Sequence, residues 1–214
     1  MTDRVLYDYW RSTAAYRVRI VLHMKGLAHD HKTVDLRTGA QDGVGFKMLN
    51  PHGRVPYLID GDTGLNQSLA ICEYLDELHP EPALLPGDAA ARAHIRAAAQ
   101  IIACDIHPIN NLAVLKYLKT ELGADEDAVG DWYRHWIATG FGALEEGAAA
   151  RGDAFLFGDA PTLADICLTP QMYNARRYRM NLEPYPRLVE IDKRMLDLDA
   201  VAKSRPEAQD GAGD

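Results

Sequence analysis

The chain has 214 residues, 47% of them hydrophobic and 25% charged, which is ordinary for a soluble globular protein of one large or two modest domains. Its formal net charge of −8, without any long run of lysine and arginine, argues against a general nucleic-acid binder. The N-terminus has no signal or transit-peptide pattern and no segment approaches about 18 uninterrupted apolar residues, so we expect a cytoplasmic protein without a membrane partner.

Three cysteines, Cys72, Cys104 and Cys167, are widely separated and lack the spacing of a disulfide framework or a zinc site. Free cysteine behaves as a small hydrophobic residue and is usually buried. We therefore interpret all three as core residues and expect no metal.

The first elements predicted are a short strand at Val5 to Tyr9 and a helix at Tyr16 to Lys25 that ends at Gly26. Ser12 and Thr13 stand at the start of this helix. A hydroxyl there either caps the helix by accepting a hydrogen bond from a backbone N–H, or acts with the positive end of the helix dipole to stabilise an anion such as a thiolate. The stretch alone favours the cap.

A short strand is predicted at His31 to Val34, and Arg37 to Gly45 is expected to be a polar loop. Val55-Pro56 then comes directly before an apolar strand. Because proline cannot donate to a sheet ladder, this position indicates an edge, a bulge or a cis turn. In the cis case, which is the minority outcome, the Val55 backbone N–H and C=O would face out of the sheet and could pair with another peptide.

Leu65 begins a further short strand that leads to Gln67, and Ser68 is expected to cap the next helix, whose inward face carries Ile71, Leu75 and Leu78. The order of elements up to this point is β-α-β-loop-β-β-α. Hydroxyl side chains at two helix N-termini predict two places where an anion would be stabilised.

The segment His79 to Asp88 contains three prolines and a glycine without periodicity, which is typical of a linker. Beyond it only helical patterns remain, and Thr162 with Asp165 forms a capping box of structural importance. We expect an α/β domain at residues 1–83, a linker at 84–90 and an all-α domain at 91–214. The helical patterns are Ala91 to Asp105, Leu112 to Leu122, Asp127 to Ala150, Leu163 to Tyr178 and Pro186 to Asp197.

Together these features resemble a cytosolic glutathione transferase, which has a thioredoxin-like N-terminal domain and an all-helical C-terminal domain. The finer resemblance is to the zeta class, which includes the maleylacetoacetate and maleylpyruvate isomerases and carries a signature similar to S-S-C-x-x-R-V-R-I-A-L. That signature stands here at Ser12 to Leu22. The likeness continues over nearly the whole chain, through Leu49 to Pro51, Asn66 to Ile71, Asn111 to Lys116 and Asn174 to Pro186.

The resemblance implies glutathione as a cofactor that is regenerated after adding reversibly, as a thiolate, to a cis diacid. Thr13 matches the thiolate-stabilising serine and Ser12 is adjacent to it. Val55 matches the residue whose backbone pairs with the cysteinyl unit, while Gln67 and Ser68 match the pair that holds the γ-glutamyl end. Further glutathione contacts are implied for Arg54, His107 and Asn111.

Binding the negatively charged carboxylates of the substrate requires cations. Arginine is the best candidate, because it binds a carboxylate through two parallel hydrogen bonds. Arg11, beside the hydroxyl pair, is a catalytic and substrate-binding candidate. Arg177 matches the arginine of the zeta pattern N-A-x-R-[FY], whereas the neighbouring Arg176 is interpreted as a surface residue. His107 is a substrate-binding candidate that would orient glutathione or polarise the diacid, and a solvated loop histidine is the alternative.

Four positions depart from the patterns of the family. Ala14 replaces the zeta-class cysteine, which disfavours thiol-transfer chemistry, and Thr13 keeps the hydroxyl of serine but adds a methyl group that is expected to alter the rotamer or slow thiolate formation. Leu112 and Ala113 stand where the maleylpyruvate enzymes carry two arginines.

The leading hypothesis is therefore an isomerase that converts maleylacetoacetate to fumarylacetoacetate. The alternatives are a maleylpyruvate isomerase, a transferase that conjugates or dehalogenates small electrophilic acids, and a non-catalytic glutathione-binding protein. The resemblance also implies a homodimer.

Overall fold

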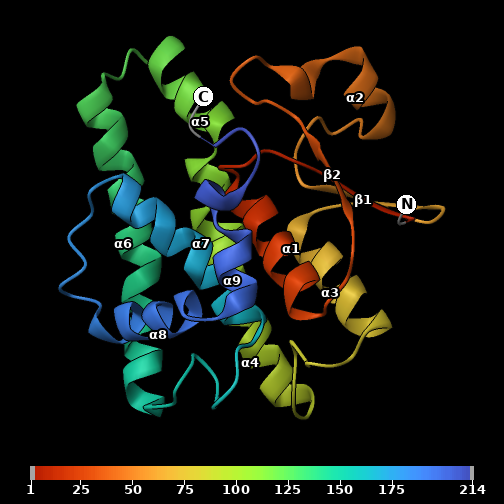
Figure 1. Cartoon of the computed structure of the whole chain (residues 1–214). Helices are drawn as coiled ribbons and strands as arrows, with labels where there is room; N and C mark the ends of the chain where they lie inside the picture. The colour runs from red at the N-terminus through yellow and green to blue at the C-terminus, as the bar shows by residue number, and fades with distance from the viewer. Residues whose placement is uncertain (1–2, 213–214) are drawn as a thin grey trace. The chain divides into compact units, whose positions relative to one another are not determined.

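Four short strands form one mixed sheet in the order β2-β1-β3-β4 in the computed structural model, which describes residues 3–212 (Figure 1). β1 pairs in parallel with β2 and antiparallel with β3, and β3 pairs antiparallel with β4. Leu6 lies opposite Leu58 and both are fully buried, so one face of the sheet contributes an apolar row to the core. The strands are β1 (Arg4–Asp8), β2 (Asp30–Thr33), β3 (Tyr57–Asp60) and β4 (Thr63–Asn66).

The chain divides into two compact units. Unit 1 contains the residues up to Leu84 together with the segment from Asp197 onward, and unit 2 contains Leu85–Leu196. The last segment thus differs from the expected domain limits, because α9 (Asp199–Ser204) packs against α1 (Thr13–Met24). Val201 is fully buried there. A helix of six residues is too short for periodicity to reveal its packing partner.

Helices α1 and α3 (Ser68–Leu78) pack against each other in unit 1 (Figure 1). Ile71 and Leu75 are buried as predicted, but Leu78, the last residue of α3, is 53% exposed. The expectation that Ser68 caps α3 is wrong, since the N-cap is Gln67 and Ser68 is the first helical residue. Gln67 has a positive φ of 67°, which turns the chain from β4 directly into α3 one residue earlier than the hydroxyl suggests. The side chain of Gln67 forms no capping hydrogen bond.

The segment Arg37 to Gly45 is not simply a loop. It contains a 3₁₀ turn, η1 (Ala40–Asp42), and runs into the helix α2 (Val44–Leu49). Phe46 is the buried residue of α2, and its ring lies 6.1 Å from that of Tyr7. Because a single buried aromatic residue anchors this short helix, its sequence carries no amphipathic period that would have predicted it.

Unit 2 is entirely helical, and the predicted combination of a thioredoxin-like and an all-helical domain is confirmed. α7 is its most buried helix, and the capping box of Thr162 and Asp165 is present at its start. Along the described residues, no helix is both long and apolar enough to cross a membrane. The elements are α4 (Ala89–Gln100), the π-helical turn η2 (Ile101–Ile106), the 3₁₀ turn η3 (Pro108–Asn110), α5 (Leu112–Thr120), α6 (Glu126–Arg151), α7 (Leu163–Arg177) and α8 (Pro186–Leu196).

The predicted burial is wrong for one of the three cysteines, which lies in η2. Cys72 and Cys167 are buried as predicted, but Cys104 is exposed. In η2, Ile102 and Ile106 are both almost fully buried, and Cys104 lies between them on the opposite side of the wide turn. Positions 102 and 106 share one face at this spacing, so Cys104 falls on the exposed face although its residue type favours burial.

Candidate functional site

The N-terminus of α1 presents the two hydroxyl residues of the signature. Ser12 is the N-cap, and its Oγ accepts a hydrogen bond from the backbone N–H of Ala15 at 3.2 Å. Thr13 is the first helical residue, and it is buried, with 4% of its surface exposed. The capping interpretation therefore holds for Ser12. Its hydroxyl proton is still available as a donor, because a hydroxyl that accepts one bond keeps its own O–H.

Arg11 is half-buried at the same turn, with its guanidinium 5.2 Å from the centre of the Trp10 ring. This cation–π contact orients the side chain without neutralising it. Within residues 3–212, Arg11 forms no ion pair with a carboxylate. Two hydrogen bonds hold the turn in place: Arg19 Nη2 donates to the Trp10 carbonyl at 2.9 Å, and the Ser12 N–H donates to the Tyr9 carbonyl at 2.8 Å.

Arg19 belongs to a buried ion network at the end of β1. Its Nη1 lies 2.5 Å from Asp8 Oδ2, and His31 Nε2 contacts the other carboxylate oxygen. Burial alone would raise the pKa of Asp8, but the hydrogen bond from His31 and the charge of Arg19 hold it below its usual value. The same hydrogen bond raises the pKa of His31. These charges compensate one another and serve the packing of β1, β2 and α1.

Val55 precedes β3, and its bond to Pro56 is cis. In the described part of the chain, neither the N–H nor the C=O of Val55 bonds to another backbone group, so both are available to a peptide. Arg54 is exposed, and its carbonyl accepts a hydrogen bond from Asn50 Nδ2 at 2.7 Å. Asn50 is fully buried and holds this loop in place. The sequence predicts no role for Asn50, although it lies in the stretch Leu49 to Pro51 that resembles the zeta class.

The N-terminus of α3 combines several unusual features. Its N-cap, Gln67, adopts a left-handed backbone and provides no side-chain cap. The first backbone bond of the helix runs from the Ile71 N–H to the Gln67 carbonyl, so the N–H groups of residues 68–70 point out of the helix end. Ser68, 7% exposed, accepts a hydrogen bond at 3.1 Å from Nη1 of the buried Arg17. This arrangement is suited to hold an anion.

Arg17 was missed by the sequence analysis. The apolar periodicity of Val18, Val21 and Leu22 leaves it among the polar positions, yet only 1% of Arg17 is exposed because α1 is covered on every side. The available signal was its place inside the zeta signature, between the hydroxyl pair and Arg19.

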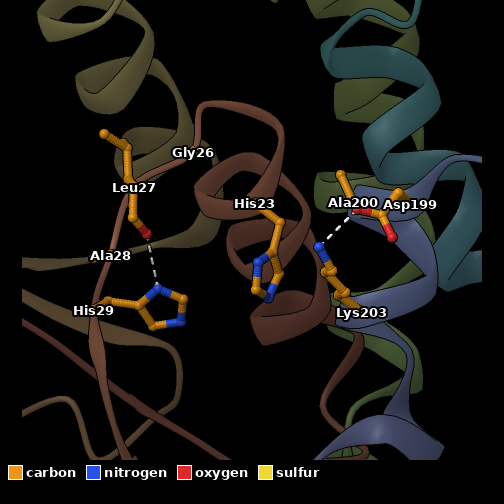
Figure 2. Close-up of a pocket in the computed structure, with 8 residues that line it drawn as sticks. All are labelled: His23, Gly26, Leu27, Ala28, His29, Asp199, Ala200 and Lys203. Atoms are coloured by element: carbon orange, nitrogen blue, oxygen red, sulfur yellow. Dashed lines mark hydrogen bonds and ion pairs between the residues drawn. The ribbon is translucent and has the colours of Figure 1, made fainter.

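A surface pocket of unit 1 lies elsewhere, between the end of α1 and α9 (Figure 2). His23 and His29 face each other there, and Lys203 forms an ion pair with Asp199 at 2.7 Å. Burial is the main reason why the pKa values of both histidines are lowered, which favours their neutral forms. None of the predicted site residues lines this pocket.

Two predicted residues of unit 2 flank η3. His107 ends the π-helical turn, with its N–H donating to the Ile102 carbonyl at 2.9 Å. Asn111 is the N-cap of α5, and its Oδ1 accepts hydrogen bonds from the N–H groups of Ala113 at 2.9 Å and Val114 at 3.2 Å. Its Nδ2 donates to the Pro108 carbonyl. The side chain of Asn111 is thus engaged in starting α5.

The end of α7 separates the two neighbouring arginines. Arg176 Nη2 lies 2.5 Å from Oδ2 of the fully buried Asp192, so Arg176 ties α7 to α8. Arg177 is exposed and lies 5.0 Å over the ring of Tyr178, which itself stacks on the buried Tyr133 with ring centres 3.6 Å apart and planes 8° from parallel. Within residues 3–212, no carboxylate pairs with Arg177.

Comparison with known proteins identifies the family. Residues 6–83 match the family described as glutathione S-transferase, N-terminal domain, and residues 128–191 match the corresponding C-terminal domain. The chain is 46% identical to a probable maleylacetoacetate isomerase of Vibrio cholerae, over 99% of this chain and all of that protein.

Solved structures agree with this assignment. A zeta-class maleylpyruvate isomerase in its holo form superposes with a TM-score of 0.95 at 44% identity, covering 97% of this chain and 99% of that one. The maleylacetoacetate isomerase of Methylobacterium extorquens AM1, with bound malonate and glutathione, gives a TM-score of 0.94 at 38% identity, covering 98% and 100%. The chain belongs to the glutathione transferase family, in the zeta class that includes the maleylacetoacetate and maleylpyruvate isomerases.

Proposed function

We propose that the protein is a glutathione-dependent cis–trans isomerase that converts maleylacetoacetate to fumarylacetoacetate. The observation that carries the proposal is the pair of helix N-termini in unit 1, one with the hydroxyls of Ser12 and Thr13 and the other with Ser68 beside a buried arginine. A thiol-bearing acidic peptide needs one such site for its sulfur and one for a carboxylate.

The residues present fit glutathione. The unpaired backbone of Val55 would pair with the cysteinyl unit, and Gln67 and Ser68 at the N-terminus of α3 would hold the γ-glutamyl carboxylate. The exposed guanidinium of Arg54 is available to a second carboxylate. When bound, glutathione supplies a thiolate for reversible addition to the double bond of the diacid.

Thr13 and Ser12 would donate hydroxyl protons toward the sulfur. The positive end of α1 adds to their effect, and both favour the thiolate over the thiol, whose ordinary pKa is about 8.5. Ala14 provides no sulfur of its own, so a mixed disulfide cannot form at this position. Thr13 and Ser12 are therefore assigned the role of holding the thiolate in its reactive state.

The substrate carboxylates would be bound by Arg11 and Arg177. Each keeps an unneutralised charge and is oriented by an aromatic ring, which fits a cation awaiting an anionic ligand. His107 is proposed to orient the diacid. Arg176 is left out of this set because its charge is already used by Asp192.

We further propose that the enzyme is a cytoplasmic homodimer. Support comes from large apolar side chains that are exposed on both units of the single chain, more than half of their surface in each case. They lie on α2 and α5 and in the turn after α5: Val44, Met48, Leu112, Tyr117 and Leu122.

The test follows the ultraviolet absorbance of freshly ring-opened maleylacetoacetate and maleylpyruvate with enzyme and a trace of glutathione, while free thiol is titrated in parallel. Loss of the cis isomer with thiol conserved is expected, with maleylacetoacetate the faster substrate because Leu112 and Ala113 provide no cations for the smaller diacid. Stoichiometric loss of thiol on chlorinated or other electrophilic acids, without isomerisation, would instead identify a conjugating transferase.

Variants of the hydroxyl pair refine the test. Thr13→Ala is expected to lower kcat/KM by about a hundredfold, the usual effect of removing a donor to a developing or stabilised anion, and Thr13→Ser should retain activity. Thr139→Ala is the matched control, since this hydroxyl bonds only within α6. Unchanged turnover in the double variant Ser12→Ala, Thr13→Ala would refute the assignment.

A further inference from the structure

Unit 1 contains a buried guanidinium, that of Arg17, which forms no ion pair with a carboxylate of the described residues. Arg17 is 1% exposed, and its single hydrogen-bond partner among the described residues is the neutral hydroxyl of Ser68. Its Nε and Nη2 atoms are buried without a partner among the described residues. A buried cation that lacks a counter-charge is destabilising by itself, so a residue of this kind is retained at a cost to the stability of the free protein.

Arg19 provides the internal comparison, because it lies two residues further along the same helix and is equally buried. Its three nitrogen groups reach the carboxylate of Asp8 and the carbonyls of Ser204 and Trp10. The fold thus compensates one arginine of α1 fully. The other, Arg17, is left pointing at the N-terminus of α3.

The contact between Arg17 and Ser68 determines the direction of the serine proton. A guanidinium only donates hydrogen bonds, so Ser68 Oγ must accept from Arg17, and its own O–H is left to donate to another group. The N–H groups of residues 68–70 lie at the same helix end and have no backbone acceptor within the helix. One O–H, up to three N–H groups and a buried positive charge therefore converge on whatever binds at the start of α3.

We propose that Arg17 is a positioning residue for the γ-glutamyl carboxylate of glutathione. It acts through Ser68, whose hydroxyl it holds as a donor, and it supplies a buried charge that is neutralised when that carboxylate binds. The inference rests on the proposed function, because it takes glutathione as the ligand. It adds a residue that supports the ligand site from inside the fold and is separate from the hydroxyl pair at α1.

The experiment measures two quantities on purified full-length protein: the dissociation constant of glutathione by calorimetry, and the melting temperature without ligand. The dissociation constant is also measured for an analogue of glutathione, 4-aminobutyryl-cysteinylglycine, which lacks only the γ-glutamyl carboxylate. Arg17→Met is expected to weaken glutathione binding by about tenfold or more, as for loss of a charge-supported hydrogen bond. Binding of the analogue should stay within about twofold, and the melting temperature of the ligand-free protein should stay equal or rise.

Three further variants complete the test. Arg17→Lys, which keeps the charge and loses the fork, should fall between the wild type and Arg17→Met. Ser68→Ala should lower the preference for glutathione over the analogue, and adding Arg17→Met to it should cause less further loss than in the wild type. Arg37→Met, which removes an exposed positive charge from the same unit, is the control and should leave both affinities unchanged.

The outcomes test the proposed glutathione-dependent function and the role of Arg17 separately. If the wild type binds neither ligand, the proposed function fails. If the wild type binds glutathione but Arg17→Met weakens both ligands equally, or lowers the melting temperature without changing the preference, Arg17 is a structural residue and the inference is overturned. Should Arg17→Met not fold, Arg17→Lys and the Ser68→Ala cycle decide the question through the ratio of the two affinities.

Discussion

The two buried arginines of α1 should respond in opposite ways to the same substitution. Arg19→Met removes the guanidinium nitrogen that lies 2.5 Å from Asp8, a carboxylate with no exposed surface. Leaving a buried charge without its partner costs about 3–5 kcal/mol of unfolding free energy, a large part of the roughly 5–15 kcal/mol typical of a whole protein. Arg17→Met removes a buried charge that pairs with no carboxylate in the described chain, so its effect should be near zero or stabilising.

The assay is urea denaturation at neutral pH followed by far-ultraviolet circular dichroism. With a slope of about 3 kcal/mol per molar urea, the loss of about 3–5 kcal/mol should lower the midpoint for Arg19→Met by about 1 to 1.7 M. The double variant Asp8→Leu, Arg19→Met should recover much of this loss, because it removes both charges. A loss below about 1 kcal/mol for Arg19→Met, or an equal loss for Arg17→Met, would refute this view of the two arginines.

Three further substitutions test other contacts. Asp8 raises the pKa of His31 above its ordinary value of 6.5. The contribution of His31 to stability is therefore complete below pH 6.5 and is lost as the pH rises through the raised pKa. Urea midpoints of the wild type should decline across that window, and those of His31→Gln should not. Gly140→Val should destabilise unit 2 by about 1–3 kcal/mol, since a Cβ there overlaps the side chain of Ile106; a thermal melt matching the wild type would exclude this close approach. Asp165→Asn keeps the size of the side chain but places an amide before backbone N–H donors, so a loss of about 1–3 kcal/mol is expected in the same melt, and an unchanged midpoint would contradict the importance of the capping box.

Local signals allowed the order of the four strands and of α1 and α3 to be predicted, because glycines, prolines and capping residues separate most of them, whereas α2 was not predicted. The capping box at Thr162 was predicted for the same reason, since both of its members lie within one turn. The position of α9 could not be predicted in this way. Its contact with α1 joins residues 185 positions apart, and no local pattern contains that information.

The candidate site shows the same division between local and long-range information. Hydroxyls at helix starts identified Ser12, Thr13 and Ser68, but the pattern placed Ser68 one position wrong, since nothing in the sequence announces the left-handed backbone of Gln67. No role was predicted for Arg17, because the apolar periodicity of α1 leaves it among the polar positions. Its burial arises only when α3 and α9 cover the remaining faces of α1.

The return of the C-terminal segment to α1 has a consequence for the order in which the protein is made. Synthesis runs from the N-terminus, so the strands and α1 of unit 1 leave the ribosome long before Ser204, the residue that accepts the Arg19 hydrogen bond. All of Leu85–Leu196 is available to fold in that interval. The half of the protein that is translated first is therefore the half that is finished last, and a nascent chain halted before Asp199 would have a completed helical unit beside a sheet unit whose first helix still lacks its cover.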